Sequence, residues 1–298
     1  MNWSLGFSSL LTAAVLFSSW LWSPFIKHQE STPTFRADVR LVEVYATVLD
    51  RKGRHVAGLP QEAFEVYDNG ISQRIVSFQS SGDELSCALL LDMTGSMAEA
   101  LPAVKNATIS LINGLRDADW IAVYGFNTSL RLLQDFTRDK EAAKRVVMRI
   151  RPAGGTALFD AISQVALDLS IRKGKRIVIV FTDGNDNSSF LNAEAAIARA
   201  RRVGLPVHTV AQGDALKSRA LLEKLSELSQ ATYGLGFVAR RSRDIEDIFA
   251  AISKDVTNTY MLAYAPPQAG GAKWRSIEVA VKDPRGMKVR AKKGYTPN

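Results

Sequence analysis

Two kinds of hydrophobic pattern divide the chain. Between residues 84 and 257, short apolar runs alternate with stretches in which apolar residues recur every three or four positions, which indicates strands alternating with amphipathic helices. We predict strands at 86–91, 120–127, 130–134, 176–181, 206–211 and 234–239, and helices at 97–115, 139–150, 157–171, 193–202, 218–229 and 243–256. Because strands joined through helices pair in parallel, the pattern predicts an α/β fold with a doubly wound, mostly parallel sheet, Rossmann-like in architecture, and helices on both faces.

The segments on either side of this region have a β pattern. In residues 35–83, apolar and polar positions alternate, and Asp68-Asn69-Gly70 after such an alternation is a strong hairpin signal. Residues 258–298 return to β composition but are too short to bury a core of their own. We expect them to pair with residues 35–83 in one small β-sandwich into which the α/β domain is inserted. The alternative is two separate hairpins packed on that domain.

The first 26 residues carry no charged side chain and are rich in large apolar residues. Such a segment is either a secretion signal or an N-terminal membrane anchor, and the polar residues 27–34 are the linker that follows. The absence of a basic residue near Met1, together with Trp20 and Trp22 at the far end, favours an uncleaved anchor. The chain is therefore expected to be exported. It would be membrane-anchored and face the periplasm, or be secreted or periplasmic if the signal is cleaved.

Composition and charge limit the possible functions. The chain has 298 residues, of which 46% are hydrophobic and 23% charged, as in globular proteins. Its single cysteine, Cys87, excludes an internal disulfide and a cysteine-based zinc cluster, and it opens an apolar strand, which favours buried packing. The net charge of +8 comes from basic clusters at 172–176, 199–202, 240–243 and 288–293, separated by acidic helices. This scattering predicts a solvated surface, with an anionic membrane or an acidic protein as partner and no nucleic acid.

Hard oxygen donors follow three of the predicted elements. Asp92, Thr94 and Ser96 stand two residues apart directly after a buried strand, Thr156 follows a Gly-Gly pair at the start of a helix, and Asp183 follows another buried strand. Ligands gather beyond the carboxyl ends of the strands in an open parallel sheet, so these five side chains are expected to converge there. Carboxylates and hydroxyls are the donors that magnesium, manganese and calcium select.

The order of these motifs resembles the von Willebrand factor type A family. Its metal-ion-dependent adhesion site has an Asp-x-Ser-x-Ser loop, a distant Thr and a distant Asp. Asp92, Ser96, Thr156 and Asp183 match this pattern, and Thr94 replaces the first Ser while keeping the hydroxyl. The resemblance covers residues 84–257. The whole layout is similar to bacterial von Willebrand type A-related exported proteins known mainly from acidobacteria.

The same residues are compatible with several different roles. Thr94 and Ser96 are also common helix caps, which would make the loop structural. A phosphatase-like hydrolase would use Asp92 as nucleophile, but it needs a second acid where Thr94 stands. A serine hydrolase lacks its Gly-x-Ser-x-Gly motif, and His208, within a predicted strand, is better explained as a core histidine. A scaffold that binds no metal is disfavoured by the complete donor set.

The sequence therefore predicts a metal-ion-dependent, adhesion-type protein-binding module at the cell envelope rather than an enzyme. The expected cofactor is Mg²⁺, with Mn²⁺ or Ca²⁺ as alternatives, and the expected partner is a protein that offers an Asp or Glu side chain to the ion. Asp160 is expected to act locally, and residues 185–187 are expected to form a polar loop beside the site.

Overall fold

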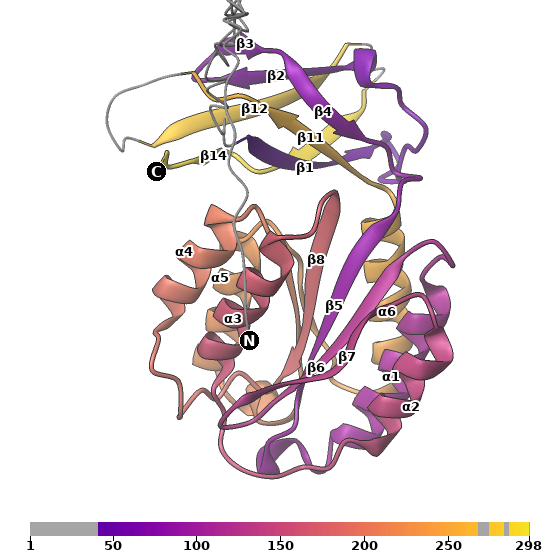
Figure 1. Cartoon of the computed structure of the whole chain (residues 1–298), viewed down its shortest axis with the longest axis vertical. Coiled ribbons are helices and arrows are strands. Elements are labelled where there is room, and N and C mark those ends of the chain that lie inside the picture. Colours follow the sequence, from indigo (N-terminus) through magenta and orange to yellow (C-terminus); the bar gives the residue numbers. More distant parts are fainter. Residues whose placement is uncertain (1–40, 268–273, 283–285, 298) are drawn as a thin grey trace, which may run out of the picture. The chain divides into compact units, whose positions relative to one another are not determined.

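The computed structural model describes residues 41–267, 274–282 and 286–297. Its centre is one six-stranded sheet whose strands are all parallel to their neighbours except the edge strand β7, which is antiparallel to β6. The order across the sheet is β10 (Gly236–Val238), β9 (Val207–Ala211), β8 (Lys175–Thr182), β5 (Leu85–Asp92), β6 (Trp120–Phe126) and β7 (Leu130–Thr137). The doubly wound, mostly parallel sheet predicted from the sequence is confirmed (Figure 1).

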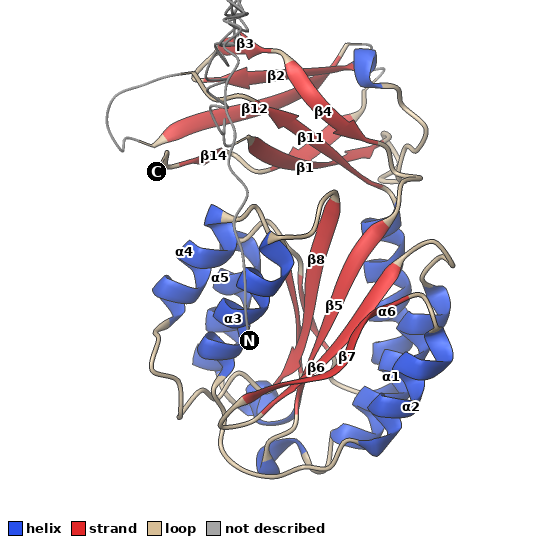
Figure 2. Ribbon diagram, in the orientation of Figure 1, coloured by secondary structure: helices blue, strands red, loops and turns tan. Residues whose placement is uncertain are grey.

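Helices cover both faces of this sheet, as Figure 2 shows. Every residue of β5 and of β8 is buried, because side chains on both faces of a central parallel strand pack against helices. One face packs on α1 (Leu101–Gly114), α2 (Lys140–Arg149) and α6 (Ser242–Thr257). The other packs on α3 (Leu158–Ser170), α4 (Ala193–Arg202) and α5 (Arg219–Ala231).

One predicted helix begins later than expected. The sequence pattern predicted a helix from residue 97, but only a short 3-10 helix, η2 (Gly95–Met97), occurs there, and α1 begins at Leu101. Pro102 occupies the first turn of α1, where its missing N–H has no helical acceptor to lose. The segment between η2 and α1 therefore belongs to the loop that follows β5.

The remaining strands form two four-stranded antiparallel sheets (Figure 1). Each sheet combines strands from before and after the α/β region, and one hydrophobic core lies between them. The first sheet has the order β13 (Lys288–Ala291), β1 (Val42–Leu49), β11 (Thr259–Tyr264) and β4 (Ile75–Gln79). The second has the order β14 (Gly294–Tyr295), β12 (Arg275–Val281), β2 (Phe64–Asp68) and β3 (Ile71–Gln73).

A two-residue turn joins β2 to β3. Asp68 pairs with Ile71, and both Asn69 and Gly70 have positive φ, at 49° and 76°. Positive φ at both central positions is the geometry that favours Asn-Gly in tight hairpins, so the hairpin predicted from this dipeptide is confirmed. Two further 3-10 helices, η1 (Gln61–Ala63) and η3 (Gly213–Lys217), lie in connecting segments.

The predicted membrane segment at residues 1–26 and the linker at 27–34 lie outside the described residues. Across residues 41–267, 274–282 and 286–297, none of the helices combines the length and the apolar character needed to cross a bilayer.

Candidate functional site

The loop after β5 holds the first three predicted donors in different environments. Asp92 is fully buried, and its Oδ1 accepts a 3.0 Å hydrogen bond from the backbone N–H of Thr94. The Thr94 side chain is buried as well, whereas Ser96 is exposed, and their hydroxyl oxygens lie 3.0 Å apart. Thr94 precedes η2 without a side-chain capping bond, so its hydroxyl does not serve as the helix cap that the sequence also allowed.

Asp183 lies at the end of the neighbouring strand. β5 and β8 are adjacent and parallel, so Asp92 at the end of β5 and Asp183 just after β8 meet at the same sheet edge. Asp183 is fully buried, and its Oδ1 accepts a 3.0 Å hydrogen bond from the N–H of Asn185. Its Oδ2 is buried and has no hydrogen-bond partner among the described residues.

Backbone contacts bring the Thr156 loop to the same edge. The N–H of Ala153 donates to the carbonyl of Met93 at 2.7 Å, and the N–H of Gly95 donates to the carbonyl of Gly154 at 3.3 Å. Thr156 itself is buried, with 2% of its surface exposed. The structure thus draws together the three loops that carry the five predicted donors.

The segment after Asp183 fixes the Thr156 loop from the other side. Oδ1 of Asn187 accepts from the N–H of Thr156 at 2.9 Å, and the N–H groups of Asn187 and Ser188 both donate to the Thr156 carbonyl. A Cβ at Gly155 would lie 2.7 Å from Oγ of Ser188 and 2.8 Å from Oδ1 of Asn187, so a larger residue there would displace these two side chains. Asn187, in the polar loop expected at residues 185–187, therefore links the segment after Asp183 to the Thr156 loop.

Burial dominates the electrostatics of Asp92. The pKa of Asp92 is raised to about 6, mainly because the side chain is removed from water; hydrogen bonds from Thr94 and Thr182 oppose the rise, and the nearby carboxylate of Asp183 adds to it. Among the described residues, neither Asp92 nor Asp183 forms an ion pair with a lysine or arginine. Two buried carboxylates therefore lie close together without a protein cation to neutralise them.

Sequence reasoning missed two partners at this edge. The hydroxyl of Thr182 donates a 2.7 Å hydrogen bond to Oδ2 of Asp92. Gln212 follows β9, the next strand, and its buried Nε2 has no hydrogen-bond partner within the described part of the chain. Thr182 belongs to the Thr-Asp-Gly motif, but nothing in the sequence indicates that a threonine at a strand end bonds to Asp92. Gln212 is placed at this edge only by the strand order, which the sequence does not give.

Asp160 acts locally, as the sequence predicted. Its two carboxylate oxygens accept the backbone N–H groups of Phe190 and Leu191, each at 2.9 Å. The neighbouring Asp186 carboxylate accepts from the N–H of Phe159 and from the N–H of Ser189. These bonds hold the loop that presents Phe190, whose side chain is fully exposed.

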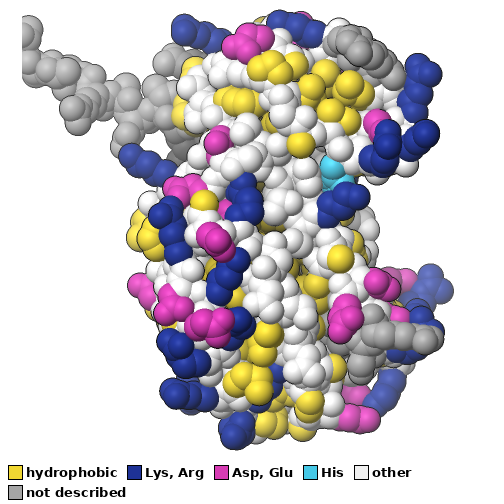
Figure 3. Space-filling model, turned by 90° about the vertical axis from the view of Figure 1, so that its right-hand side faces the viewer, with side chains coloured by type: hydrophobic (Ala, Val, Ile, Leu, Met, Phe, Trp, Pro, Cys, Tyr) yellow, Lys and Arg dark blue, Asp and Glu magenta, His cyan; other side chains and the backbone are white. Residues whose placement is uncertain are grey.

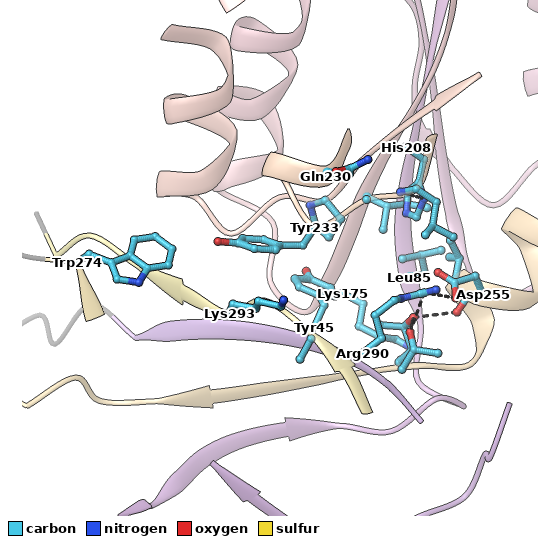
Figure 4. Close-up of a pocket in the computed structure, with 18 residues that line it drawn as sticks. Tyr45, Leu85, Lys175, His208, Gln230, Tyr233, Asp255, Trp274, Arg290 and Lys293 are labelled. Atoms are coloured by element: carbon cyan, nitrogen blue, oxygen red, sulfur yellow. Dashed lines mark hydrogen bonds and ion pairs between the residues drawn. The ribbon is translucent and has the colours of Figure 1, made fainter. Parts of the chain in front are cut away.

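His208 lines a separate cavity of about 370 Å³, drawn in Figure 4 with Tyr233, Lys293 and Trp274 among its walls. Strand register places His208 level with Leu89, two strands away from β5 and three residues before Asp92. At about 3.3 Å per residue, it lies some 10 Å back along the sheet from the donor loop. Its Nδ1 accepts the N–H of Leu235 at 3.2 Å, and burial lowers its pKa to about 4. His208 is a neutral core histidine, remote from Ser96.

Cys87 is fully buried at the start of β5. Burial raises the pKa of its thiol far above the usual value, so the residue packs rather than reacts. No three His, Cys, Asp or Glu side chains of the described ranges cluster as a metal site would require, so the candidate site depends on hydroxyl donors as well as carboxylates.

The fold and the site together define a doubly wound α/β domain with oxygen donors from three loops at the carboxyl edge of its sheet. Residues 87–185 match the family model of the von Willebrand factor type A domain. This match covers about one third of the chain and agrees with the family that the motifs indicated. No curated protein matches the sequence.

Solved structures support the fold. An aerotolerance-related membrane protein from Bacteroides fragilis is 20% identical, with a TM-score of 0.50 over 58% of this chain and 98% of its own. A von Willebrand factor type A protein from Catenulispora acidiphila is 14% identical, with a TM-score of 0.51 over 86% of this chain and 75% of its own. The corresponding domain of the type V pili tip protein Mfa5 from Porphyromonas gingivalis is 12% identical, with a TM-score of 0.50 over 57% and 94%. At these identities the similarity concerns the fold alone.

Proposed function

We propose that this chain is a metal-dependent protein-binding module that holds an acidic side chain of a partner through a divalent cation. The observation that carries the proposal is the pair of buried carboxylates, Asp92 and Asp183, at adjacent strand ends without a protein counter-cation. Burying one charge without compensation is costly, and burying two near each other is more so. A divalent cation between them would neutralise both.

The donor set fits such an ion. The orphaned Oδ2 of Asp183 and the adjacent hydroxyls of Thr94 and Ser96 offer oxygen ligands from two loops, and Thr156 adds a hydroxyl from the third. Asp92 is held in place by Thr94 and Thr182. Three hydroxyls beside two carboxylates favour Mg²⁺, with Mn²⁺ and Ca²⁺ as alternatives.

A bound cation would act as a Lewis acid toward an incoming carboxylate. The residues of the chain would leave one direction open for that ligand, and Ser96, the exposed donor, lies on the open side. Since three of the donors are uncharged, the ion would keep much of its positive charge for the partner's Asp or Glu. Binding of the partner would then require the metal.

The hydrolase alternative has weaker support. Both oxygens of Asp92 already accept hydrogen bonds and the residue is fully buried, which does not suit a nucleophile. Thr94 stands where a phosphatase that uses such an aspartate needs its second acid. Because His208 is neutral and about 10 Å back along the sheet, it is not placed to activate Ser96.

A location at the cell envelope agrees with two observations. The apolar segment at residues 1–26 predicts export, and structurally similar proteins are described as a membrane protein and a pili tip protein. We therefore place the partner at the envelope as well. The N-terminal segment would supply the contact with the membrane.

Thermal unfolding tests the ion directly. The purified chain is stripped with EDTA and then titrated with Mg²⁺, Mn²⁺ or Ca²⁺ while the melting temperature is followed. A ligand that binds only the folded state at 100 times its dissociation constant adds about 2.7 kcal/mol of stability, which is easily detected. We expect the stabilisation in the wild type and its loss in Asp92→Ala and Asp183→Asn.

Asp117→Asn is the matched control, because it removes one carboxylate before β6, at the other end of the strands, where Asp117 pairs with Lys140. This variant should respond to metal like the wild type. A wild-type melting curve that is the same with EDTA and with each metal would contradict the proposal. Turnover of generic phosphatase or esterase substrates that disappears in Asp92→Ala would favour the hydrolase instead.

The partner is tested by affinity capture from envelope proteins of the source organism. The immobilised wild type is compared in Mg²⁺, in EDTA and as Asp183→Ala. A protein retained only by the wild type in Mg²⁺ is the expected result. Equal retention of that protein in EDTA would contradict binding through the metal ion.

A further inference from the structure

Three of the four basic clusters in the sequence meet at one cavity. The cavity has a volume of about 920 Å³ and is lined by Arg176 of β8, by Arg201 and Arg202 at the end of α4, and by Lys292 just after β13. These residues come from the clusters at 172–176, 199–202 and 288–293. The sequence suggested that the positive charge is scattered, but the fold concentrates part of it here.

Arg176 is the fixed element of this wall. Its guanidinium forms an ion pair with Glu43 and donates to the carbonyls of Val203, at 3.1 Å, and Leu169, at 3.2 Å. Glu43 is the one carboxylate among the described residues that line the cavity. The charge of Arg176 is therefore largely neutralised. We assign it a structural role in the cavity wall and not a role in binding a ligand.

Lys292 is the unusual residue. It is buried, with 7% of its surface exposed, and forms no ion pair with a carboxylate of the described residues. Its ammonium lies 6.0 Å from the centre of the Tyr295 ring. The pKa of Lys292 is lowered to about 8, mainly by burial; Glu43 opposes this change and Arg201 adds to it. A buried ammonium without a bonded anion is rare, because desolvation is otherwise uncompensated.

Arg201 and Arg202 add charge, and neither forms an ion pair with a carboxylate of the described ranges. The guanidinium of Arg201 lies over Trp274, 5.4 Å from the ring centre, which positions it without neutralising it. On the face of the molecule in Figure 3, by contrast, lysines and arginines are interspersed with aspartates and glutamates. The cavity has four cations and one carboxylate, so it differs from an ordinary solvated surface.

We propose that this cavity binds an anion of phosphate type, carried by a small phosphate ester or by a phospholipid headgroup. Lys292 would give its ammonium to one oxygen, and Arg201 and Arg202 would donate from their planar guanidinium groups, whose geometry suits phosphate oxygens. The anion would supply the missing counter-charge of Lys292.

The size and the remaining lining indicate that the anion carries an organic group. A bare phosphate is much smaller than 920 Å³, and the wall also contains the apolar residues Leu41, Leu167 and Pro266. The site is separate from the proposed metal site. Arg176 is the second residue of β8, whereas Asp183 follows the last residue of that strand, so the two sites lie at opposite ends of the sheet.

Binding is measured on the full chain in nanodiscs of zwitterionic phosphatidylcholine. Glycerol 3-phosphate is titrated into the protein, and chloride at the same ionic strength is the control. Binding is followed by melting temperature and by calorimetry. In a second arm, the chain is placed in nanodiscs containing anionic phosphatidylglycerol. Stabilisation by glycerol 3-phosphate identifies a soluble ester as the source of the anion, and stabilisation by phosphatidylglycerol alone identifies a lipid headgroup.

The decisive variant is Lys292→Met, which keeps the apolar stem and removes the charge. We expect a higher melting temperature than the wild type without the anion and at least about tenfold weaker binding with it. Arg202→Gln tests the exposed part of the wall and should weaken binding about three- to tenfold. It keeps the proposal testable if Lys292→Met does not fold. Arg219→Gln, which removes one exposed charge on α5, should bind like the wild type.

Two results would overturn the proposal. One is a wild type that responds to neither glycerol 3-phosphate nor phosphatidylglycerol beyond the effect of chloride. The other is a folded Lys292→Met or Arg202→Gln protein whose response equals that of the wild type. Neither outcome depends on divalent metal, since all measurements are made in EDTA, so this proposal and the proposed metal site fail independently.

Discussion

The hydroxyl of Thr182, the last residue of β8, donates a 2.7 Å hydrogen bond to Oδ2 of Asp92, the last residue of β5. This bond joins two neighbouring strands at the sheet edge where the predicted donors meet. The same hydroxyl accepts the N–H of Gly184 at 2.9 Å. Thr182 thereby links the position of the Asp92 carboxylate to the loop that begins with Asp183.

Thr182→Val keeps the shape of the side chain and removes the hydroxyl. We expect the metal-free protein to lose about 1–3 kcal/mol of unfolding free energy, because a buried carboxylate oxygen and a buried N–H lose a partner. Metal affinity should fall as well, since Asp92 is less well oriented. Chemical denaturation and metal titration measure the two effects. Thr182→Ser retains the hydroxyl and should restore most of both, and a Val variant as stable as the Ser variant would show that the bond is unimportant.

The stability of the chain should fall in acid partly because of His208. The pKa of His208 is about 4 in the folded state and about 6.5 in an unfolded chain. Well above pH 6.5 the residue is neutral in both states, so its contribution is complete there. As the pH falls toward 4, the unfolded chain takes up a proton that the folded protein does not. The loss from this residue is of the order of 2–3 kcal/mol.

His208→Asn isolates that effect, because asparagine can still accept the N–H of Leu235 but does not titrate in this range. Urea unfolding of both proteins between pH 8 and pH 4 provides the comparison. The difference in unfolding free energy between wild type and variant should shift in favour of the variant as the pH falls. A difference that is constant with pH would show that His208 does not titrate as described.

Phe190 should matter for binding and not for stability. Its side chain is fully exposed, and its loop is held by the Asp160 carboxylate and joined to the Thr156 loop through Ser188. Phe190→Ser should change the unfolding free energy by less than about 0.5 kcal/mol. Retention of the envelope partner in Mg²⁺ should decrease, because a rigidly presented aromatic side chain is a typical interface anchor.

Ile171→Ser is the control for Phe190. Ile171 is 86% exposed but follows α3, at the opposite end of the sheet. This variant should retain the partner as the wild type does. Equal retention by both variants would exclude Phe190 from the interface, and equal loss in both would indicate a non-specific effect of surface hydrophobicity.

Asp68 should be the most sensitive carboxylate of the β-sandwich. It is fully buried, and it accepts bonds from Arg275 at 2.6 Å, from the Tyr264 hydroxyl at 2.9 Å and from the Tyr295 hydroxyl at 3.0 Å. Asp68→Ala should cost about 3–5 kcal/mol of unfolding free energy, because it leaves a largely buried arginine without its partner. Asp50→Ala, which breaks an exposed pair with Arg54, should lower the unfolding free energy far less. Comparable losses in the two variants would contradict this assignment.

Local patterns predicted most of the elements, because strand and helix periodicities are properties of short segments. The helix predicted at 193–202 coincides with α4, and the Asn69-Gly70 hairpin has the expected turn. Local signals failed where a neighbouring residue decided the outcome. Pro102 occupies the first turn of α1, so the helix starts after the donor loop and not at its end.

The donor residues were also visible in the sequence, since Asp92, Thr94, Ser96, Thr156 and Asp183 stand in recognisable motifs after predicted strands and loops. Their partners were not. Thr182 and Asn187 are ordinary polar residues until the strand order places them against Asp92 and Thr156. Asp68 looked like a turn residue, although it anchors strands that lie about 200 positions later in the chain.

The sequence by itself determined the types of element, the doubly wound class and the residues able to supply oxygen ligands, because each depends on spacing along the chain. Only the tertiary structure decided which distant side chains share a desolvated space. Lys292 and the pair Arg201 and Arg202 show the difference: they lie far apart in the sequence, which predicts solvated charges, yet the fold gathers them around one cavity. Burial and proximity set the energy of a charge, and both arise from the packing of segments that are remote in sequence.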